Sequence, residues 1–357
     1  MLGRQTMKGV ALLAFAGAIA VGAAGDATAQ KRVKWKMQSA FGSQAPLQGE
    51  SGLRFEKDMS ILSEGKFEIK FFEPGALVPA LEAFDAVSKG SVEAAWTTPG
   101  YHTGKYPGLA FMTTVPFGPQ IGEFLAWKWF GGGNAIRDEI YKQHDLFAYD
   151  CFSHGAETSG WFKNPITSLD QMKGLKMRFF GLGAKVMTKI GVSTQLLAAP
   201  DIYPALERGV IDATEFSMPV MDINLGFYQI AKNNYYPGWH QQVSVSEILM
   251  NRTKFNALPA NYQKMIEVAA QNQTIVTFAE SEAVNPDAML KMKSFGVTNR
   301  RWTDDQLAVF EKTWNEVVKE ESAKDPWFKK FADSYFAFRS KYRIWGEAQA
   351  LKSTYIE

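Results

Sequence analysis

The sequence predicts an α/β fold of two similar lobes followed by long helices, and three observations lead to this prediction. Strand-like and helix-like segments alternate through the N-terminal half, which favours sheets covered by helices. A pattern of strand and helix signals from the first 100 residues occurs again after residue 174. From residue 258 onwards turn signals become rare, which indicates a mainly helical C-terminal third.

The first lobe begins with elements that follow one another closely. Alternating or β-rich runs predict strands, and apolar residues at helical spacing predict helices between them. The predicted strands are 33–40, 67–72 and 92–97, and the predicted helices are 49–63 and 79–88. This order predicts a mainly parallel sheet.

The second lobe is predicted from two matches to the first. Residues 174–180 resemble 65–72, and residues 208–213 resemble 89–94, where a basic residue and a glycine precede a short strand. Glycine is common at helix C-caps, so one match alone means little. Two matches in the same order favour a second lobe, with strands at 175–180 and 210–216.

The C-terminal third is predicted to form long helices within 256–293, 304–324 and 325–351. Ile266, Ala269, Ile275 and Phe278 form an apolar stripe on the first of these. Periodicity does not decide whether such stripes pack on the lobes, between them or against a second subunit. We expect lobe I at 30–152, lobe II at 153–242, and a crossover strand, a long helix and C-terminal helices packing on both lobes at 243–357.

The first residues have the pattern of a secretory signal peptide. Arg4 and Lys8 precede an apolar run at 10–25, and Ala27-Thr28-Ala29 matches a signal-peptidase site. We therefore expect a signal peptide at 1–29 and an exported mature chain that begins at Gln30. The apolar run is short for a stable membrane span, and the alternative interpretation is an uncleaved membrane anchor.

Composition and motifs exclude several classes of function. The 39 lysines and arginines nearly balance the 37 aspartates and glutamates, which argues against a nucleic-acid partner. A single cysteine, Cys151, excludes an intramolecular disulfide. Metalloprotease, Walker, paired-cysteine and nucleophile-elbow motifs are missing from the sequence. The histidines have no metal-ligand spacing and are interpreted as polar core or surface residues: His102, His144, His154 and His240.

Candidate binding residues lie where two predicted strands end. Ligands of open α/β sheets bind outside the carboxyl ends of strands, and Arg178 and Glu215 occupy such ends. The guanidinium of Arg178 offers paired donors that match a carboxylate, although a surface arginine is the simpler alternative. Glu215 follows a strand that looks buried, so it needs Arg178, a ligand hydroxyl or a metal ion as partner unless it is solvated.

Several motifs resemble one known family. The matching stretches are FEPGALVP (72–79), LKMR (175–178), DIYPALE (201–207), IDATE (211–215), YYPGW (235–239) and AFRS (337–340). With them the chain resembles the extracytoplasmic solute receptors of tripartite ATP-independent periplasmic (TRAP) transporters, solute-binding protein family 7. It is most similar to the 2-oxoacid-binding branch, over essentially all of the mature chain.

The resemblance implies a non-enzymatic receptor with a two-lobed periplasmic binding protein fold. Such a receptor captures a small monocarboxylate in the periplasm and delivers it to membrane permease subunits. The monocarboxylate is either a 2-oxoacid such as pyruvate or the hydroxyacid lactate. It also permits a helix-mediated homodimer. Two alternatives remain from the residues alone. Glu157 and Glu215 could act as acid and base in a metal-dependent enzyme, or the chain could present its ligand to a sensor kinase.

The resemblance also assigns roles to residues. Arg178 matches the arginine that grips the ligand carboxylate, and we expect Arg178→Ala to abolish binding without unfolding the protein. Tyr101 matches a tyrosine that reaches the ligand from the other lobe. The remaining pocket walls are expected to be aromatic and to include Trp96, Phe180 and Trp239.

The resemblance to this family also implies a cation site. Glu215 and the backbone carbonyl of Phe216 match a bridging cation site, and Gln241 matches a polar position facing it. Phe216 replaces a tryptophan, and Glu157 replaces a glutamine of the close 2-oxoacid relative. Two carboxylates at one ion favour Ca²⁺ over Na⁺. Alternatively, Glu157 bonds a ligand hydroxyl.

Overall fold

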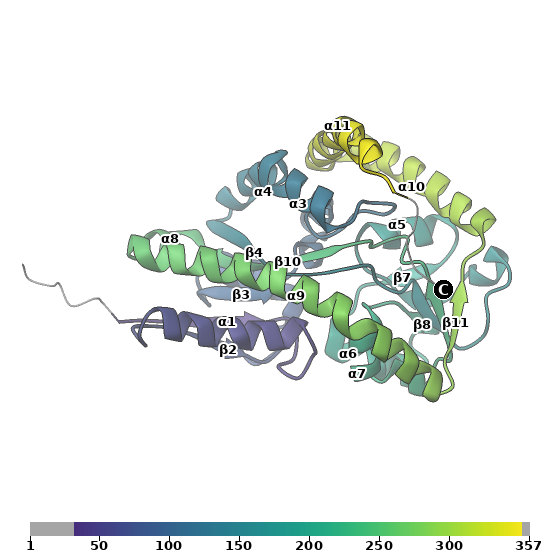
Figure 1. Cartoon of the computed structure of the whole chain (residues 1–357), viewed down its shortest axis with the longest axis horizontal. Coiled ribbons are helices and arrows are strands. Elements are labelled where there is room, and N and C mark those ends of the chain that lie inside the picture. Colours follow the sequence, from purple (N-terminus) through teal and green to yellow (C-terminus); the bar gives the residue numbers. More distant parts are fainter. Residues whose placement is uncertain (1–31, 352–357) are drawn as a thin grey trace, which may run out of the picture. The chain divides into compact units, whose positions relative to one another are not determined.

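The computed structural model describes residues 32–351, so the predicted signal peptide lies outside the described residues. Within this range the chain forms two β-sheets with helices packed on them, and long helices follow at the C-terminal end (Figure 1). The predicted α/β fold class with long C-terminal helices is confirmed.

The first sheet has five strands in the order β2-β1-β3-β10-β4. Trp35 and Met37 of its strand β1 are buried, as alternation along a strand predicts. The strands are β1 (Val33–Ser39), β2 (Phe67–Phe72), β3 (Ala94–Thr97), β4 (Leu146–His154) and β10 (Ser244–Asn251). The helices α1 (Gln48–Leu62), α2 (Ala83–Ser88), α3 (Ile121–Phe130), α4 (Gly133–Lys142) and α8 (Arg252–Asn256) lie in the same part of the chain, with short 3₁₀ turns at Ala80–Glu82, Pro99–His102 and Pro107–Met112.

The second sheet has six short strands in the order β11-β9-β5-β8-β6-β7. They are β5 (Gly160–Phe162), β6 (Lys176–Arg178), β7 (Ser193–Gln195), β8 (Ala213–Thr214), β9 (Asn233–Tyr236) and β11 (Thr298–Arg301). The helices of this region are α5 (Gly181–Lys189), α6 (Ala199–Glu207) and α7 (Pro219–Asn224), with 3₁₀ turns at Leu169–Met172 and Phe227–Gln229.

Both sheets are mainly parallel, as predicted, and each contains one strand that runs against the others. β1 pairs in parallel with β2 and β3, but β10 runs antiparallel to β3 and β4. In the second sheet β5 runs antiparallel to β8 and β9. The antiparallel strands arise where the chain leaves the first sheet at 155–159 and returns to it at 237–243. These two crossing segments carry Glu157 and Gln241.

Two strands predicted for the second lobe are shorter than expected. The predicted strand at 210–216 is reduced to β8, because the amides of Val210 and Ile211 donate to the Ala205 carbonyl and end helix α6 instead. The predicted strand at 175–180 is reduced to β6, because the Phe180 amide donates to the Glu215 side chain. One strand is thus shortened by the end of helix α6 and the other by a hydrogen bond to the Glu215 side chain.

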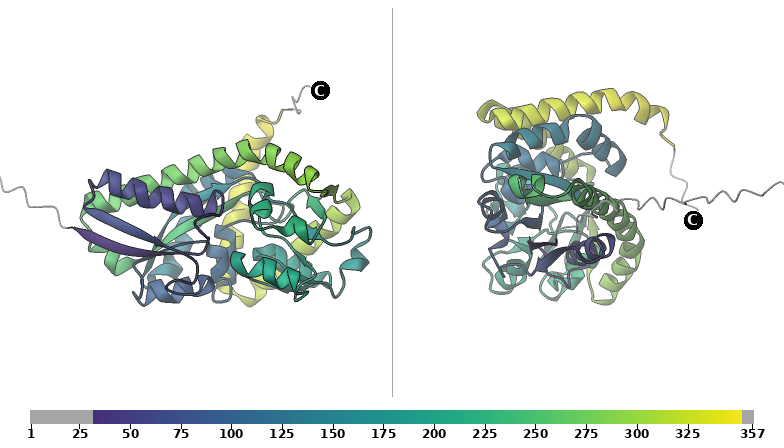
Figure 2. Two further views of the ribbon diagram at one scale, coloured as in Figure 1. Left: turned by 90° about the horizontal axis from the view of Figure 1, so that it is seen from below. Right: turned by 90° about the vertical axis from the view of Figure 1, so that its left-hand side faces the viewer.

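Helix α9 (Ala260–Ser294) runs alongside both sheets, contacting β4 and α1 near its start and α7 and β11 further along (Figures 1 and 2). The predicted apolar stripe is only partly correct: Ile266 and Ala269 are buried, but Ile275 is 52% exposed. The middle of α9 instead buries small polar residues, and the Ser153 amide donates to Thr277 Oγ1 at 3.0 Å. Polar contacts thus join α9 to the end of β4.

Two further helices complete the C-terminal third. They are α10 (Asp304–Lys324), which contacts α5, and α11 (Pro326–Ala348), which contacts α3 and α4. Among residues 32–351, none of the helices combines the length and apolar character needed to cross a membrane. The lobe boundaries expected from the sequence stay a prediction.

Candidate functional site

Strands β6 and β8 are neighbours, and their ends bring the two predicted charges together. They pair in parallel with Arg178 opposite Thr214. Arg178 is the last residue of β6, and Glu215 and Phe216 directly follow β8. Side chains at the carboxyl ends of adjacent parallel strands share one edge of a sheet, so the sheet register itself places Arg178 beside Glu215.

Arg178 is 1% exposed, and its guanidinium is held by several contacts. Nη1 donates to Glu215 Oε1 at 2.8 Å and to the Glu215 backbone oxygen at 2.6 Å. Nε donates to the Leu197 backbone oxygen at 3.3 Å. The rings of Phe180 and Phe216 lie 5.8 and 5.2 Å from the guanidinium carbon. The alternative of a surface arginine is excluded.

The two oxygens of the Glu215 carboxylate have different surroundings. Oε1 accepts from Arg178 and, at 2.5 Å, from the Phe180 amide. Oε2 accepts no hydrogen bond among the described residues and lies 3.4 Å from His240 Nε2. Burial raises the pKa of Glu215, but Arg178, His240 and the Phe180 amide outweigh it and hold the pKa below its usual range. Glu215 is therefore an anion with one oxygen still available.

Glu157 reaches the same place from the first crossing segment. Its amide donates to the Gln241 backbone oxygen at 3.0 Å, which joins the two crossing segments. Oε1 lies 3.3 Å from His154 Nε2, and Oε2 lies 3.7 Å from His240 Nε2. Burial, assisted by repulsion from Glu215, raises the pKa of Glu157 despite the nearby His240.

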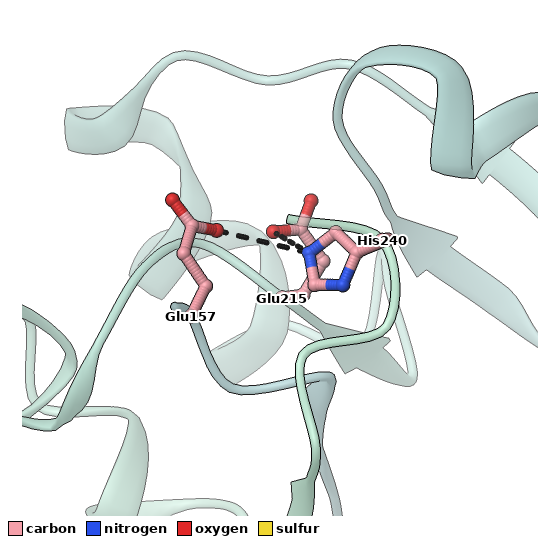
Figure 3. A group of neighbouring side chains, drawn as sticks. All are labelled: Glu157, Glu215 and His240. Atoms are coloured by element: carbon pink, nitrogen blue, oxygen red, sulfur yellow. Dashed lines mark ion pairs between the residues drawn. The ribbon is translucent and has the colours of Figure 1, made fainter. Parts of the chain in front are cut away.

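His240 lies beside both carboxylates, with its ion pairs to them drawn as dashed lines in Figure 3, and the sequence interpretation missed it. Burial alone would lower the pKa of His240, but both glutamates raise it above its usual value. We had assigned the four histidines to the core or surface from their spacing in the sequence. The available signal was the position of His240 directly before Gln241, in a segment matched to the family.

This cluster has the properties of a cation site. Oxygen atoms of Glu157 and Glu215 and a nitrogen of His240 lie within 4.8 Å of one another, and all three residues are buried. Oε2 of each glutamate and Oε1 of the nearby Gln241 accept no hydrogen bond among the described residues. Buried acceptors without donors are costly unless something else satisfies them, and hard cations such as Ca²⁺ prefer such oxygens. The donor set therefore fits a cation.

A small cavity adjoins the cluster and contains most of the predicted binding residues. It is lined by Phe41, Gln48, Thr98, Tyr101, Glu157, Arg178, Phe180, Phe216, Gln241, Ser244 and Ser246. Tyr101 follows β3 of the first sheet, whereas Arg178 and Phe180 come from the second, so both sheets contribute walls. Burial raises the pKa of Tyr101 to about 12, so its hydroxyl keeps its proton at neutral pH.

Two predicted pocket aromatics are not among the residues lining this cavity. The Trp239 ring stacks on Phe117 and Phe310, with centroids 5.7 and 4.7 Å away. Trp96 Nε1 donates to the Gln48 backbone oxygen at 3.0 Å. Both tryptophans are buried in hydrophobic clusters, so they support the walls from behind instead of forming them.

The cavity volume is about 20 Å³, and one water molecule needs about 10–15 Å³. A ligand of several heavy atoms can enter only if the walls move apart. A larger groove of about 360 Å³ lies between α9 and the crossing segments, but its lining contains the anionic Glu282 and no cationic side chain. The small cavity, which contains Arg178, is therefore the better carboxylate site.

The comparisons with known proteins agree with this geometry. The model of bacterial extracellular solute-binding protein family 7 matches residues 39–325. The chain is 35% identical, over 83% of its length and 81% of the relative, to a monocarboxylate 2-oxoacid-binding periplasmic protein of Nostoc sp..

Two solved structures are similar over nearly the whole chain. One is a TRAP transporter solute-binding protein from Bordetella bronchiseptica, a mixed-occupancy dimer with co-purified calcium and picolinate. It has 32% identity and a TM-score of 0.87, covering 90% of this chain and 95% of that one. The other, from Pseudoalteromonas atlantica, has bound sodium and pyruvate. It has 28% identity and a TM-score of 0.85, covering 89% and 97%. The chain described here is thus a periplasmic solute-binding receptor, not an enzyme, and belongs to family 7 of the bacterial extracellular solute-binding proteins.

Proposed function

We propose that this receptor captures a small monocarboxylate, either a 2-oxoacid such as pyruvate or the hydroxyacid lactate, together with a bridging cation, for uptake by a TRAP permease. The observation that carries the proposal is one cavity lined by the buried Arg178 guanidinium and the Glu157 carboxylate, with Glu215 paired to Arg178 beside it. Arg178 is the one cationic side chain among the residues that line it. Relatives whose names or structures include 2-oxoacids, pyruvate, calcium or sodium support the ligand class.

The proposed roles follow from the contacts. Arg178 binds the ligand carboxylate through Nη2, because Nη1 already donates to Glu215 and Nε to the Leu197 oxygen. Tyr101 and Phe180 enclose the ligand from opposite sheets, and their rings already meet edge to face with centroids 5.7 Å apart. Trp239 acts indirectly, by packing beneath the neighbouring segment.

The cation is assigned to Glu215 Oε2, the Phe216 carbonyl, Gln241 Oε1 and Glu157. When bound, it supplies positive charge that attracts both ligand oxygens and relieves the repulsion between the glutamates. We favour Ca²⁺ over Na⁺, because two carboxylates provide more negative charge than a monovalent ion balances. With the cation bound, His240 would be a neutral imidazole, because a protonated ring has no lone pair to offer the ion and would repel it.

Capture requires opening and closing of the walls. The enclosed cavity is too small to admit a ligand directly, so the closed form must exchange with a more open one. A ligand shifts this exchange only by its differential affinity for the closed form. The closed, loaded receptor is the form that we expect the permease to recognise.

We also propose that the receptor forms a homodimer through helix α11. Ile344 and Trp345 near its end are 77% and 60% exposed, an unusual state for large apolar side chains. The B. bronchiseptica relative was described as a dimer. Light scattering should give twice the chain mass, and replacing both residues with serine should yield the single-chain mass.

A thermal-shift screen tests the function. Purified, chelator-treated receptor is mixed with 2-oxoacids, hydroxyacids, dicarboxylates and aromatic acids, each with Ca²⁺, Na⁺ or neither. We expect pyruvate-like acids to raise the melting temperature only with a cation present, because a ligand that binds the folded state stabilises it. A shift produced by dicarboxylates but not by monocarboxylates would refute the proposed ligand class.

A further inference from the structure

Asp222 is a fully buried carboxylate that does not line the cavity. It lies in helix α7 and accepts three hydrogen bonds. The Ser217 amide donates to Oδ1 at 3.1 Å, and Trp161 Nε1 and Thr158 Oγ1 donate to Oδ2 at 2.7 and 3.3 Å. Such a carboxylate is costly to bury, even with its acceptors satisfied.

The donors to Asp222 belong to the segments that carry the two glutamates of the cation site. Thr158 directly follows Glu157, and Ser217 lies two residues after Glu215. The same segments also meet through the backbone, where the Thr158 amide donates to the Ser217 oxygen at 2.9 Å. One side chain behind the site thus joins the backbones on both sides of it.

The two glutamates repel each other once both are ionised, which is the state that binds a cation, and they then need such a connection. Their Oε2 atoms accept no hydrogen bond among the described residues, and the closest positive group, His240, lies at 3.4 and 3.7 Å. Repulsion in a buried site is poorly screened. Without a tie behind them, the crossing segment and the turn after β8 would separate, and the spacing of the cation ligands would widen.

We infer that Asp222 is a positioning residue that holds the segments of Glu157 and Glu215 at the spacing a cation requires. This inference rests on the proposed function, because it assigns Asp222 a role in that same cation site. It goes beyond the ligand set itself: Asp222 lies behind the two segments, and its three hydrogen bonds go to donors of the chain.

Asp222→Asn tests the inference with almost no change in shape. An asparagine has one acceptor oxygen, so its amide group must face either the Ser217 amide or the donors from Trp161 and Thr158. One buried donor is then left unpaired. We expect the Ca²⁺ concentration that half-restores pyruvate binding to rise about tenfold, a change that one lost buried hydrogen bond can produce. The measurement is calorimetric titration, well below the melting temperature, on chelator-treated protein.

Several outcomes are distinguishable. A lower melting temperature with an unchanged half-restoring Ca²⁺ concentration would mean a purely structural role and would overturn the inference. If the wild-type protein binds pyruvate equally well without any cation, the proposed cation site itself fails. Asp287→Asn, at an exposed position on α9, is the matched control and should behave as wild type.

Thr158→Val and Thr158→Ser test the hydrogen bond to Asp222 separately from the charge of Asp222. They also decide whether Asp222 is a positioning residue if Asp222→Asn does not fold. Valine removes the hydroxyl that donates to Asp222 and accepts from Asn234 Nδ2 at 3.1 Å, whereas serine keeps it. Neither substitution changes the charge. We expect valine, but not serine, to raise the half-restoring Ca²⁺ concentration by about threefold, somewhat less than the loss of one full hydrogen bond. Equal values for the two variants would contradict the inference.

Discussion

The Arg178 guanidinium and the Glu215 carboxylate are paired within the cavity wall, with Nη1 and Oε1 2.8 Å apart. Only one oxygen of Glu215 is used in this way, and Oε2 points to Glu157 and His240 (Figure 3). Glu215 therefore orients the Arg178 guanidinium, the proposed partner of the ligand carboxylate, and also contributes an oxygen to the proposed cation site. This shared residue couples the two halves of the proposed ligand site.

The pairing revises our expectation for Arg178. Alanine would leave the buried Glu215 without its main partner, which costs about 3–5 kcal/mol of stability, so lost binding and lost folding would be confounded. Arg178→Lys keeps the charge but removes the planar fork. We expect Arg178→Lys to remain folded and to bind pyruvate about 10–100-fold more weakly, measured by calorimetry. If Arg178→Lys bound pyruvate as strongly as the wild type, the planar guanidinium would not be the group that holds the ligand carboxylate.

Glu157→Gln tests the choice of cation. The substitution removes one negative charge and introduces the neutral amide that the family resemblance implies at this position. We expect the Ca²⁺ concentration that supports pyruvate binding to rise about tenfold or more, while the Na⁺ requirement changes less, because charge matters most for a divalent ion. The measurement is the half-restoring concentration of each ion after chelation. Glu64→Gln, at an exposed position, is the control; equal effects on both ions would argue that Glu157 bonds the ligand instead.

Substitutions at Gly100 and Phe180 test whether the contact between these two residues, which lie on loops of different sheets, controls closure of the cavity. A Cβ atom at Gly100 would lie 2.0 Å from Phe180 Cζ, which is too close for any contact. Gly100→Ala should therefore hinder closure and weaken pyruvate binding by about tenfold. In a Phe180→Ala background the ring is gone, so adding Gly100→Ala should cost little. Calorimetry on the wild type, the two single variants and the double variant measures how far the effect of Gly100→Ala depends on the Phe180 ring. Additive losses of pyruvate affinity would contradict the prediction.

His102 should make stability depend on pH. Burial lowers the pKa of His102 to about 3, so the folded protein keeps it neutral, while the unfolded chain binds a proton below about 6.5. Its contribution to the free energy of unfolding is therefore lost as the pH falls through 6.5. Glu247, whose pKa burial raises to about 7, acts in the opposite direction, because its contribution is lost as the pH rises.

A comparison with His102→Gln measures the contribution of the histidine, whose Nε2 lies 3.8 Å from Glu247 Oε1. We expect the loss of stability caused by His102→Gln to be about 2 kcal/mol smaller at pH 5.0 than at pH 7.5, since only the wild type loses stability through this histidine. Urea unfolding at the two pH values measures the difference. A mutational effect that is the same at both values would mean that His102 is not held neutral by burial.

Some of the site could be predicted from the sequence because strand ends carry local signals. Arg178 and Glu215 follow short apolar runs, and carboxyl ends of neighbouring strands meet at one edge. Tyr101, Phe180, Phe216 and Gln241, which the family motifs indicate, line the cavity together with Arg178. Trp239 was expected in the same wall but packs on Phe117 and Phe310, because its segment turns that ring towards the C-terminal helices.

The sequence by itself determined the fold class, the family and the two charges at the ends of β6 and β8. These depend on residue type and spacing along the chain, which local propensity and motifs report directly. Only the tertiary structure decided that His240 lies beside both glutamates, that Asp222 accepts hydrogen bonds from both of their segments and that one strand of each sheet runs against the others. Each of these depends on where the chain crosses between sheets. Such crossings are set by the pairing of strands far apart in sequence, which no local pattern encodes.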